Sequence, residues 1–287
     1  VRVLKYLHER CASSQVRGHI TQDLLSRYGI DNTRAIGCPS LLYARKPALK
    51  IRPPSLDNVS FTITDMGRLP DIHDWQFSLM ETLLQQSDKF SVAAQGGEFV
   101  LQDFISARDG VSTLEREDFV AEAKDDAVEI SPKTDFSGAM APGDFMLSKT
   151  TRLDLDALEK SARWYYRDCS PALQDNIIDR AFYSPLLSEY VRRSRDLSLC
   201  VGTRLHGNLI AMSQGCPAIF AIHDYRLKEM AEFLGAPSVS FETRDATIDL
   251  EDADWSEFER RSQNYWPDFR AFFEENGLKI HDLKEEV

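Results

Sequence analysis

The stretch that decides the fold is residues 197–208, which read LSLCVGTRLHGN. It opens with a continuous apolar run, residues 197–201, of the kind that forms a central strand buried on both faces of a parallel sheet. A short turn follows, and then a predicted helix from about Gly207 to Gln214, closed by Gly215. Strand, turn and helix in this order are the repeating element of an α/β fold.

The same alternation extends along the chain in both directions from this stretch. We expect further strands at residues 13–16, 33–36, 59–64, 90–94 and 217–222. We expect helices at about residues 1–12, 19–28, 75–87, 155–167, 185–193, 228–234 and 255–275. For the acidic residues 108–155 we expect a helical piece and a mobile loop.

Residues 44–57 hold three prolines and several basic residues, which is typical of a linker. The sequence therefore predicts an α/β protein of two Rossmann-like domains. We assign residues 1–55 to the C-terminal part of the first domain, 56–250 to the second, and 251–287 to a C-terminal helical segment. The first residues read as the middle of a helix, so we expect the true N-terminus to be missing.

The composition narrows the class of partner. The chain has 287 residues with 43% hydrophobic and 28% charged side chains, which suits folded domains. Its net charge of −12, without a basic stretch, speaks against a nucleic-acid partner. A local basic pocket for a small anion is still compatible with an acidic surface.

The cysteines, histidines and apolar runs indicate whether to expect disulfides, a metal site or a membrane span. The five cysteines are odd in number, widely spaced and without a CxxC pair, so neither a disulfide framework nor a zinc site is expected. The histidines lack ligand spacing, so we expect no metal. No apolar run reaches the roughly 20 residues of a membrane span. We expect a cytoplasmic protein, with association to the inner face of the membrane left open.

Arg204 and His206 are the first candidate site residues. They follow a predicted central strand, and ligands of open α/β sheets bind beyond the carboxyl ends of the strands. A helix N-terminus beside an arginine suits a phosphate or carboxylate, and Gly207 lets an anion approach the backbone. Thr203 and Asn208 flank this pair and join the candidate set. The alternative is a turn with a solvent-exposed arginine and a helix-capping histidine.

A second candidate segment, residues 223–228 (HDYRLK), follows the next predicted strand and is expected at the same edge. Asp224 is either a substrate contact or simply the N-cap of the following helix. Arg226 and Lys228 either add positive charge to an anion site or lie in solvent. Between these two, we favour Arg226.

Two further candidates lie elsewhere. Arg17 stands between a strand and a helix of the first domain, and a cleft between the domains places it opposite Arg204. Gln95 and Glu98 follow the strand at 90–94, where they are candidates for hydrogen bonds to a sugar. The alternatives are a solvent-exposed arginine and a plain glycine turn.

Two blocks of the sequence contain ordered sets of motifs. Residues 14–42 (SQVRGHITQDLLSRYGIDNTRAIGCPSLL) contain V-R-G, a helix, and a strand that ends in I-G-x-P-S. Residues 197–237 contain G-x-R-x-H-G, then G-x-P, then a basic residue after a strand. In these motifs and in their order the two blocks, which cover about a quarter of the chain, resemble the polysaccharide pyruvyltransferase family. The Asn-x-Gly-Asp-type loop that usually opens family members has no counterpart here.

The resemblance implies a GT-B-like arrangement of the two domains and a transferase without a cofactor. The donor would be phosphoenolpyruvate. The acceptor would be a sugar of a cell-surface or exopolysaccharide precursor, lipid-linked or polymeric, which receives the enolpyruvyl group as a pyruvate ketal. By position, Arg204 and His206 match the family's R-x-H, which binds the donor and takes part in catalysis. Arg17 matches the arginine of the first block, and Arg226 stands where many members have a lysine.

Two other readings stay open. The same anion site would serve a GT-B glycosyltransferase that uses a nucleotide sugar. A non-catalytic family member that acts in polysaccharide assembly would keep the fold without turnover. The sequence leaves open the acceptor sugar, the stereochemistry of the ketal and the oligomeric state, with which a homo-oligomer is compatible.

Overall fold

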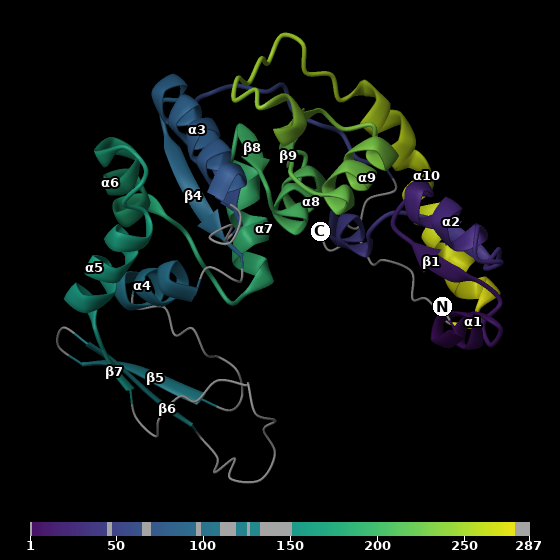
Figure 1. Cartoon of the computed structure of the whole chain (residues 1–287), viewed down its shortest axis with the longest axis horizontal. Coiled ribbons are helices and arrows are strands. Elements are labelled where there is room, and N and C mark those ends of the chain that lie inside the picture. Colours follow the sequence, from purple (N-terminus) through teal and green to yellow (C-terminus); the bar gives the residue numbers. More distant parts are fainter. Residues whose placement is uncertain are drawn as a thin grey trace, which may run out of the picture.

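A computed structural model describes residues 2–44, 48–64, 70–95, 99–109, 119–124, 127–132 and 151–278. These residues form a mixed α/β structure with parallel sheets, which confirms the predicted class. A five-stranded sheet lies in the middle, a two-stranded unit at one end, and an antiparallel sheet at the other (Figure 1). The predicted domain boundaries at residues 55 and 250 stay predictions.

The five-stranded sheet is parallel throughout and has the strand order β10-β9-β8-β3-β4. Its strands are β3 (Val59–Ile63), β4 (Phe90–Ala94), β8 (Leu199–Gly202), β9 (Ala218–Ile222) and β10 (Ser238–Ser240). The chain runs outward from β3 to β4 in one direction and from β8 to β10 in the other. The order therefore reverses between β3 and β8, and such a switch point is where open α/β sheets bind ligands.

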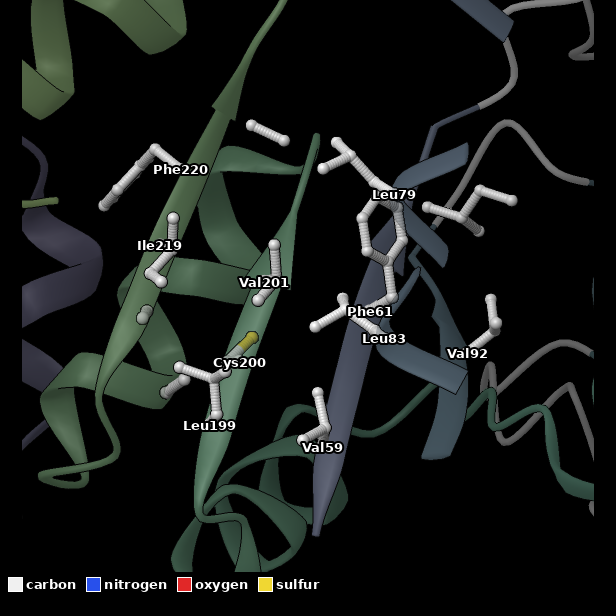
Figure 2. Packing of buried hydrophobic residues seen from close by; sticks show 14 of the residues in the cluster. Val59, Phe61, Leu79, Leu83, Val92, Leu199, Cys200, Val201, Ile219 and Phe220 are labelled. Atoms are coloured by element: carbon white, nitrogen blue, oxygen red, sulfur yellow. The ribbon is translucent and has the colours of Figure 1, made fainter. Parts of the chain in front are cut away.

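The core of this sheet is apolar across neighbouring strands. Phe61 of β3 is in register with Val201 of β8, which is in register with Ile219 of β9, and all three are buried. Leu79 and Leu83 of α3 (Pro70–Gln86) cover the sheet (Figure 2). Full burial of each such side chain contributes about 1.5–3 kcal/mol, so the sheet gives the switch point a rigid base.

Helices connect and cover the strands. They are α5 (Leu155–Tyr165), α6 (Pro171–Arg180), α7 (Leu187–Asp196), α8 (Leu205–Ser213) and α9 (Tyr225–Leu234), with the short 3₁₀ helix η2 (Phe241–Thr243) after β10. Helix α6 and strand β10 were not predicted. The sequence does contain a signal for the start of α6, because a serine followed by a proline is typical of a helix N-terminus. In the structure Ser170 is the N-cap and accepts a hydrogen bond from the Leu173 amide, and Pro171 follows it.

The two-stranded unit consists of β1 (Ser14–Val16) and β2 (Thr33–Ala35), which are parallel and joined by α2 (His19–Ser26). Helix α1 (Arg2–His8) precedes it, and the 3₁₀ helix η1 (Pro39–Ala44) leads from it toward α8. The long helix α10 (Ser256–Glu275) returns to this unit (Figure 1). There Glu275 pairs with Arg34 at 2.8 Å and accepts a hydrogen bond from the Ser13 hydroxyl.

Within residues 108–155 the structure describes mainly strands where we expected a helical piece, and the expected loop falls on residues outside the described part. A helix, α4 (Phe99–Asp109), ends at the start of this region. It is followed by an antiparallel sheet of β5 (Phe119–Lys124), β6 (Ala127–Pro132) and β7 (Thr151–Asp154). The strands are short and acidic residues interrupt their alternation, which hides the strand signal.

The predicted linker is a packed segment in its described part, residues 48–57. Arg52 donates to the carbonyl oxygens of Arg195, Leu197 and Gly215. The Leu49 amide donates to the Ser262 hydroxyl of α10. Residues 45–47 lie outside the described part. Throughout the described ranges, no helix combines the length and apolar character needed to cross a membrane.

Candidate functional site

The site predicted from Arg204 lies at the switch point of the five-stranded sheet. Arg204 lies two residues after the end of β8 and is the N-cap residue of α8 in extended backbone conformation (φ −98°, ψ 117°). Its Nε donates to the main-chain oxygen of Ile63, the last residue of β3, at 3.1 Å. The guanidinium is therefore held between the carboxyl ends of β3 and β8, where a bound anion is expected.

The N-terminus of α8 carries no side-chain cap. The first hydrogen bond back along the helix runs from the Asn208 amide to the Arg204 oxygen at 3.3 Å. The amides of Leu205, His206 and Gly207 precede that bond and have no acceptor within the helix. With the partial positive charge of the helix end, they favour a negatively charged ligand beside Arg204.

The helices α9 and α2 differ from α8 at this point. In α9 the Asp224 carboxylate accepts from the Leu227 amide at 2.8 Å, so the N-cap alternative for Asp224 is the one the structure has. In α2 the Thr21 amide donates to Glu229 of α9 at 2.5 Å, and the Thr21 hydroxyl donates to the same carboxylate. Among the residues that the structure describes, no carboxylate caps the N-terminus of α8, in contrast to α9 and α2.

His206 lies in the first turn of α8 and is exposed. Cys38, a residue of the first unit that is 3% exposed, lies near enough for this imidazole to lower the pKa of its thiol. Burial raises the pKa of this thiol, but hydrogen bonds with His206 and Ser40 outweigh that effect and bring the pKa to about 7. Sequence reasoning missed Cys38, although it stands inside the I-G-C-P-S stretch quoted above.

Thr203 and Asn208 are fully buried beneath this surface. The Thr203 hydroxyl donates to Gln76 Oε1 of α3 at 2.6 Å. The side-chain Nδ2 of Asn208 donates to the main-chain oxygen of Gly202 at 3.0 Å. Both side chains support the junction of β3, β8 and α8 from below. Neither side chain is open to solvent, and the binding role predicted for them stays a prediction.

Gly207 is required by packing. A Cβ at this position would lie 2.4 Å from Cγ2 of Thr62 and 3.0 Å from Nε2 of Gln95. Side chains of β3 and of the β4 end therefore fill the space where a side chain would lie, and the approach of an anion to the Gly207 backbone stays a prediction. Gln95 lies beside the start of α8, and the hydrogen bond to a sugar predicted for it stays a prediction. Glu98 lies outside the described residues.

The histidine at the end of β9 is more buried than the one after β8, and the nearby arginine is paired with a carboxylate. His223, whose side chain is 6% exposed, has Nε2 at 3.7 Å from Asp224. Burial lowers the pKa of His223, the charges of Arg226 and Arg204 lower it further, and Asp224 and the Ala221 backbone oppose them. Arg226 is exposed and pairs with Asp224 at 3.3 Å, so its charge is partly compensated.

Arg17 is half-buried at the start of α2, next to Gly18. A Cβ on Gly18 would meet Glu229 at 2.4 Å, so this turn lies against α9. Within the described ranges Arg17 makes no hydrogen bond or ion pair, and no contact with Arg204 supports the predicted opposition of the two. Its role in donor binding stays a prediction.

Two other features bear on ligands. A hollow of about 530 Å³ lies between α2, α9 and α10, lined in part by His19, Phe233, Arg261 and Tyr265. It lies away from Arg204 and His206, so it is not the predicted site. In the part of the chain that the structure describes, no three histidine, cysteine or carboxylate side chains gather as metal ligands.

Comparison with known families and with curated proteins finds no match to this chain. The class of this protein is therefore described from its fold and its candidate site. It is an α/β protein whose parallel sheet carries an arginine, an exposed histidine and an uncapped helix N-terminus at its switch point.

Proposed function

We propose that the chain is a polysaccharide pyruvyltransferase with two Rossmann-like domains in a GT-B-like arrangement. The observation that carries the proposal is the uncapped N-terminus of α8 beside Arg204 at the β3–β8 switch point. The residues there are those of the G-x-R-x-H-G block that resembles this family. A chain with the block but with a carboxylate on this helix end would have no place for an anionic donor.

Phosphoenolpyruvate suits the chemistry of this edge. It carries a phosphate and a carboxylate, and each binds well to a guanidinium and to the amides of a helix N-terminus. Arg204 and the first turn of α8 supply both kinds of donor on one side of the sheet. Arg226 is a secondary contact in this proposal, because Asp224 already pairs with it.

His206 is the proposed proton donor. Its exposure lets it reach a ligand, and an imidazole can both give and take up a proton during a reaction. In the proposed reaction His206 protonates the methylene carbon of phosphoenolpyruvate, which makes C2 electrophilic. Two hydroxyls of the acceptor sugar add to C2, the C2–O bond to phosphate breaks, and phosphate leaves. Of the two hydroxyl protons, one restores His206 and the other leaves with phosphate.

The test of the donor is a thermal-shift titration of the chain with phosphoenolpyruvate, a nucleoside diphosphate and inorganic phosphate in parallel. We expect selective stabilisation by phosphoenolpyruvate that is lost in Arg204→Ala, since a ligand that binds the native state raises its melting temperature. Stabilisation by the nucleotide alone would favour the glycosyltransferase reading. Stabilisation by phosphoenolpyruvate without phosphate release on any acceptor sugar would favour the non-catalytic reading.

A further inference from the structure

The hollow of about 530 Å³ lies where α2 of the two-stranded unit meets α9 and α10 (Figure 1). Glu229 of α9 fixes α2 in place, because its two carboxylate oxygens accept from the amide and the hydroxyl of Thr21 at 2.5 and 2.8 Å. Arg261 of α10 donates to the main-chain oxygens of Glu232 and Phe233 of α9, each at 2.6 Å. The helices around the hollow are therefore held together, and its volume suits a small-molecule ligand.

Two aromatic rings line this hollow. Phe233 and Tyr265 lie nearly parallel, with 6.1 Å between the ring centroids and 22° between the ring planes. A Cβ on Gly37 would lie 2.8 Å from the Phe233 ring, so the two-stranded unit supports that ring from behind. Tyr265 is 6% exposed, and its hydroxyl has no hydrogen-bond partner among the described residues. Burial raises the pKa of Tyr265, so the hydroxyl keeps its proton, and a ligand oxygen would give it the acceptor that it lacks.

Three polar side chains of the hollow are free to bind a ligand. Asn264 and Asp268 lie four residues apart on α10, on the face that carries Tyr265, and Glu232 lies on α9. All three are exposed, and within the described ranges their side chains make no hydrogen bond or ion pair. Together they offer two carboxylates that accept hydrogen bonds and one amide that both donates and accepts.

The two guanidinium groups of the hollow are already paired. Arg260 and Arg261 contact the Glu257 carboxylate at 2.7 and 2.6 Å. With their charges compensated, the free carboxylates of Glu232 and Asp268 make the hollow unfavourable for a phosphate or carboxylate ligand. It suits a neutral ligand with hydroxyls that donate to carboxylates and an apolar face that packs on aromatic rings. A sugar ring has both, because its hydroxyls project outward and its C–H groups form an apolar face.

We propose that the hollow between α2, α9 and α10 is a saccharide-binding site, separate from the donor site at the end of β8. Its aromatic pair, Phe233 and Tyr265, takes the apolar face of a sugar ring, and Asn264, Asp268 and Glu232 bind the hydroxyls. The source of the sugar rests on the proposed function, in which a polymeric or lipid-linked acceptor is long enough to reach both sites. Binding of a sugar to the hollow does not rest on it.

The first test does not depend on turnover. Carboxylates of the native chain are labelled with a carbodiimide and glycine ethyl ester in the presence of glucose, galactose, mannose or N-acetylglucosamine, and mass spectrometry follows each labelled peptide. We expect at least one sugar to slow the labelling of Glu232 and Asp268, with the rate at about half when its concentration equals its Kd. The labelling of Asp252, an exposed carboxylate that does not line the hollow, should stay unchanged.

The matched variants are neighbours on α10. Asn264→Ala removes an amide that lines the hollow, whereas Gln263→Ala removes an exposed amide that does not. We expect Asn264→Ala to need about 2–10-fold more sugar for the same protection, which is the usual loss for a hydrogen bond, and Gln263→Ala to match the wild type. No protection by any of the sugars in the wild type, or equal protection in the two variants, would overturn the proposal. Protection by tetramethylammonium without protection by a sugar would overturn it too, because the carboxylates would then serve a cation.

The second test links the hollow to the acceptor. The protecting sugar is supplied with phosphoenolpyruvate, either as its methyl glycoside or as an oligosaccharide. A chain held at a second place presents its reacting unit at a raised effective concentration. We therefore expect Asn264→Ala to raise KM for the oligosaccharide at least about twofold, with a smaller change in kcat and in KM for the methyl glycoside.

An equal KM for the oligosaccharide in the wild type and in Asn264→Ala would refute the role of the hollow in holding the acceptor. Absence of turnover in the wild type, with protection of Glu232 and Asp268 intact, would count against the proposed function and leave the saccharide site standing. The two failures are therefore distinguishable.

Discussion

The ends of β8 and β9 lie side by side at one edge of the sheet, and they are built differently. Each strand is followed by an arginine and a histidine, one in the turn and the other in the first turn of the next helix. After β8 the helix N-terminus is uncapped and His206 is exposed. After β9 the helix is capped by Asp224 and His223 is buried. On this comparison, basic residues alone do not make the proposed anion site, which also needs helix amides without a side-chain cap.

The first unit extends the comparison. At the start of α2, the amide and hydroxyl of Thr21 already bind the Glu229 carboxylate. Glu229 thus fastens the first unit to α9 and fills the position that an anion would take. Arg17 beside it is consequently a weaker candidate for donor binding than Arg204.

The largest expected effect is the loss of turnover when His206 is replaced. His206→Ala should lower kcat about 10²–10⁴-fold, the usual contribution of a general acid, with little change in melting temperature because the side chain is exposed. Phosphate release from phosphoenolpyruvate in the presence of an acceptor sugar measures this. His19→Ala, also exposed and in the first turn of its helix, is the control and should keep wild-type kcat. Wild-type turnover in His206→Ala would remove the β8 end from the mechanism.

The next effect concerns the packing under α8. Gly207→Ala should destabilise the fold by about 1–3 kcal/mol, since the new methyl group would lie 2.4 Å from Thr62 Cγ2. Chemical denaturation monitored by circular dichroism gives the free energy of unfolding. Adding Thr62→Ser removes that methyl group and should recover part of the loss. Full stability of Gly207→Ala alone would show that α8 is not held as tightly against β3 as described.

The sequence predicts the secondary structure around β8 better than it predicts the contacts between distant segments. The β8–α8–β9 region was predicted well, because a continuous apolar run and the closing glycines Gly215 and Gly235 are local signals. The α6 cap was local too, but was overlooked. The sequence could not predict which side chains bind the N-terminal amides of each helix, because Glu229, which accepts from the Thr21 amide, lies 208 positions away in the chain. Cys38 and His206 likewise meet only through the fold.

A smaller effect sharpens the contrast at α9. Asp224→Ala should cost about 0.5–2 kcal/mol of stability, because the Leu227 amide loses its acceptor. Asp224→Ser keeps a capping oxygen and should retain most of that stability. Urea denaturation of both variants measures the difference. Equal stability of the alanine variant and the wild type would mean that the α9 end is not closed by this carboxylate in solution.

The smallest effect is on pH dependence. The pKa of His223 is lowered in the folded protein, chiefly by burial, so the unfolded chain takes up the proton more readily. The stability that the neutral ring contributes is complete above its ordinary pKa, about 6.5, and is lost as pH falls through the lower folded value. Melting curves at pH 7.5 and 5.5 should therefore show a smaller acid destabilisation in His223→Asn than in the wild type. An identical pH response would place the imidazole in solvent.

The measurement that tests the account most directly is calorimetric titration of phosphoenolpyruvate into the wild type, Arg204→Ala and Arg226→Ala. The account predicts at least about tenfold weaker binding in Arg204→Ala, in line with about 1.5–3 kcal/mol for a hydrogen bond to a charged group. It predicts a clearly smaller change in Arg226→Ala, whose guanidinium is exposed and already paired with Asp224. The reverse order, with binding lost in Arg226→Ala and kept in Arg204→Ala, would contradict the assignment of the donor site to the end of β8.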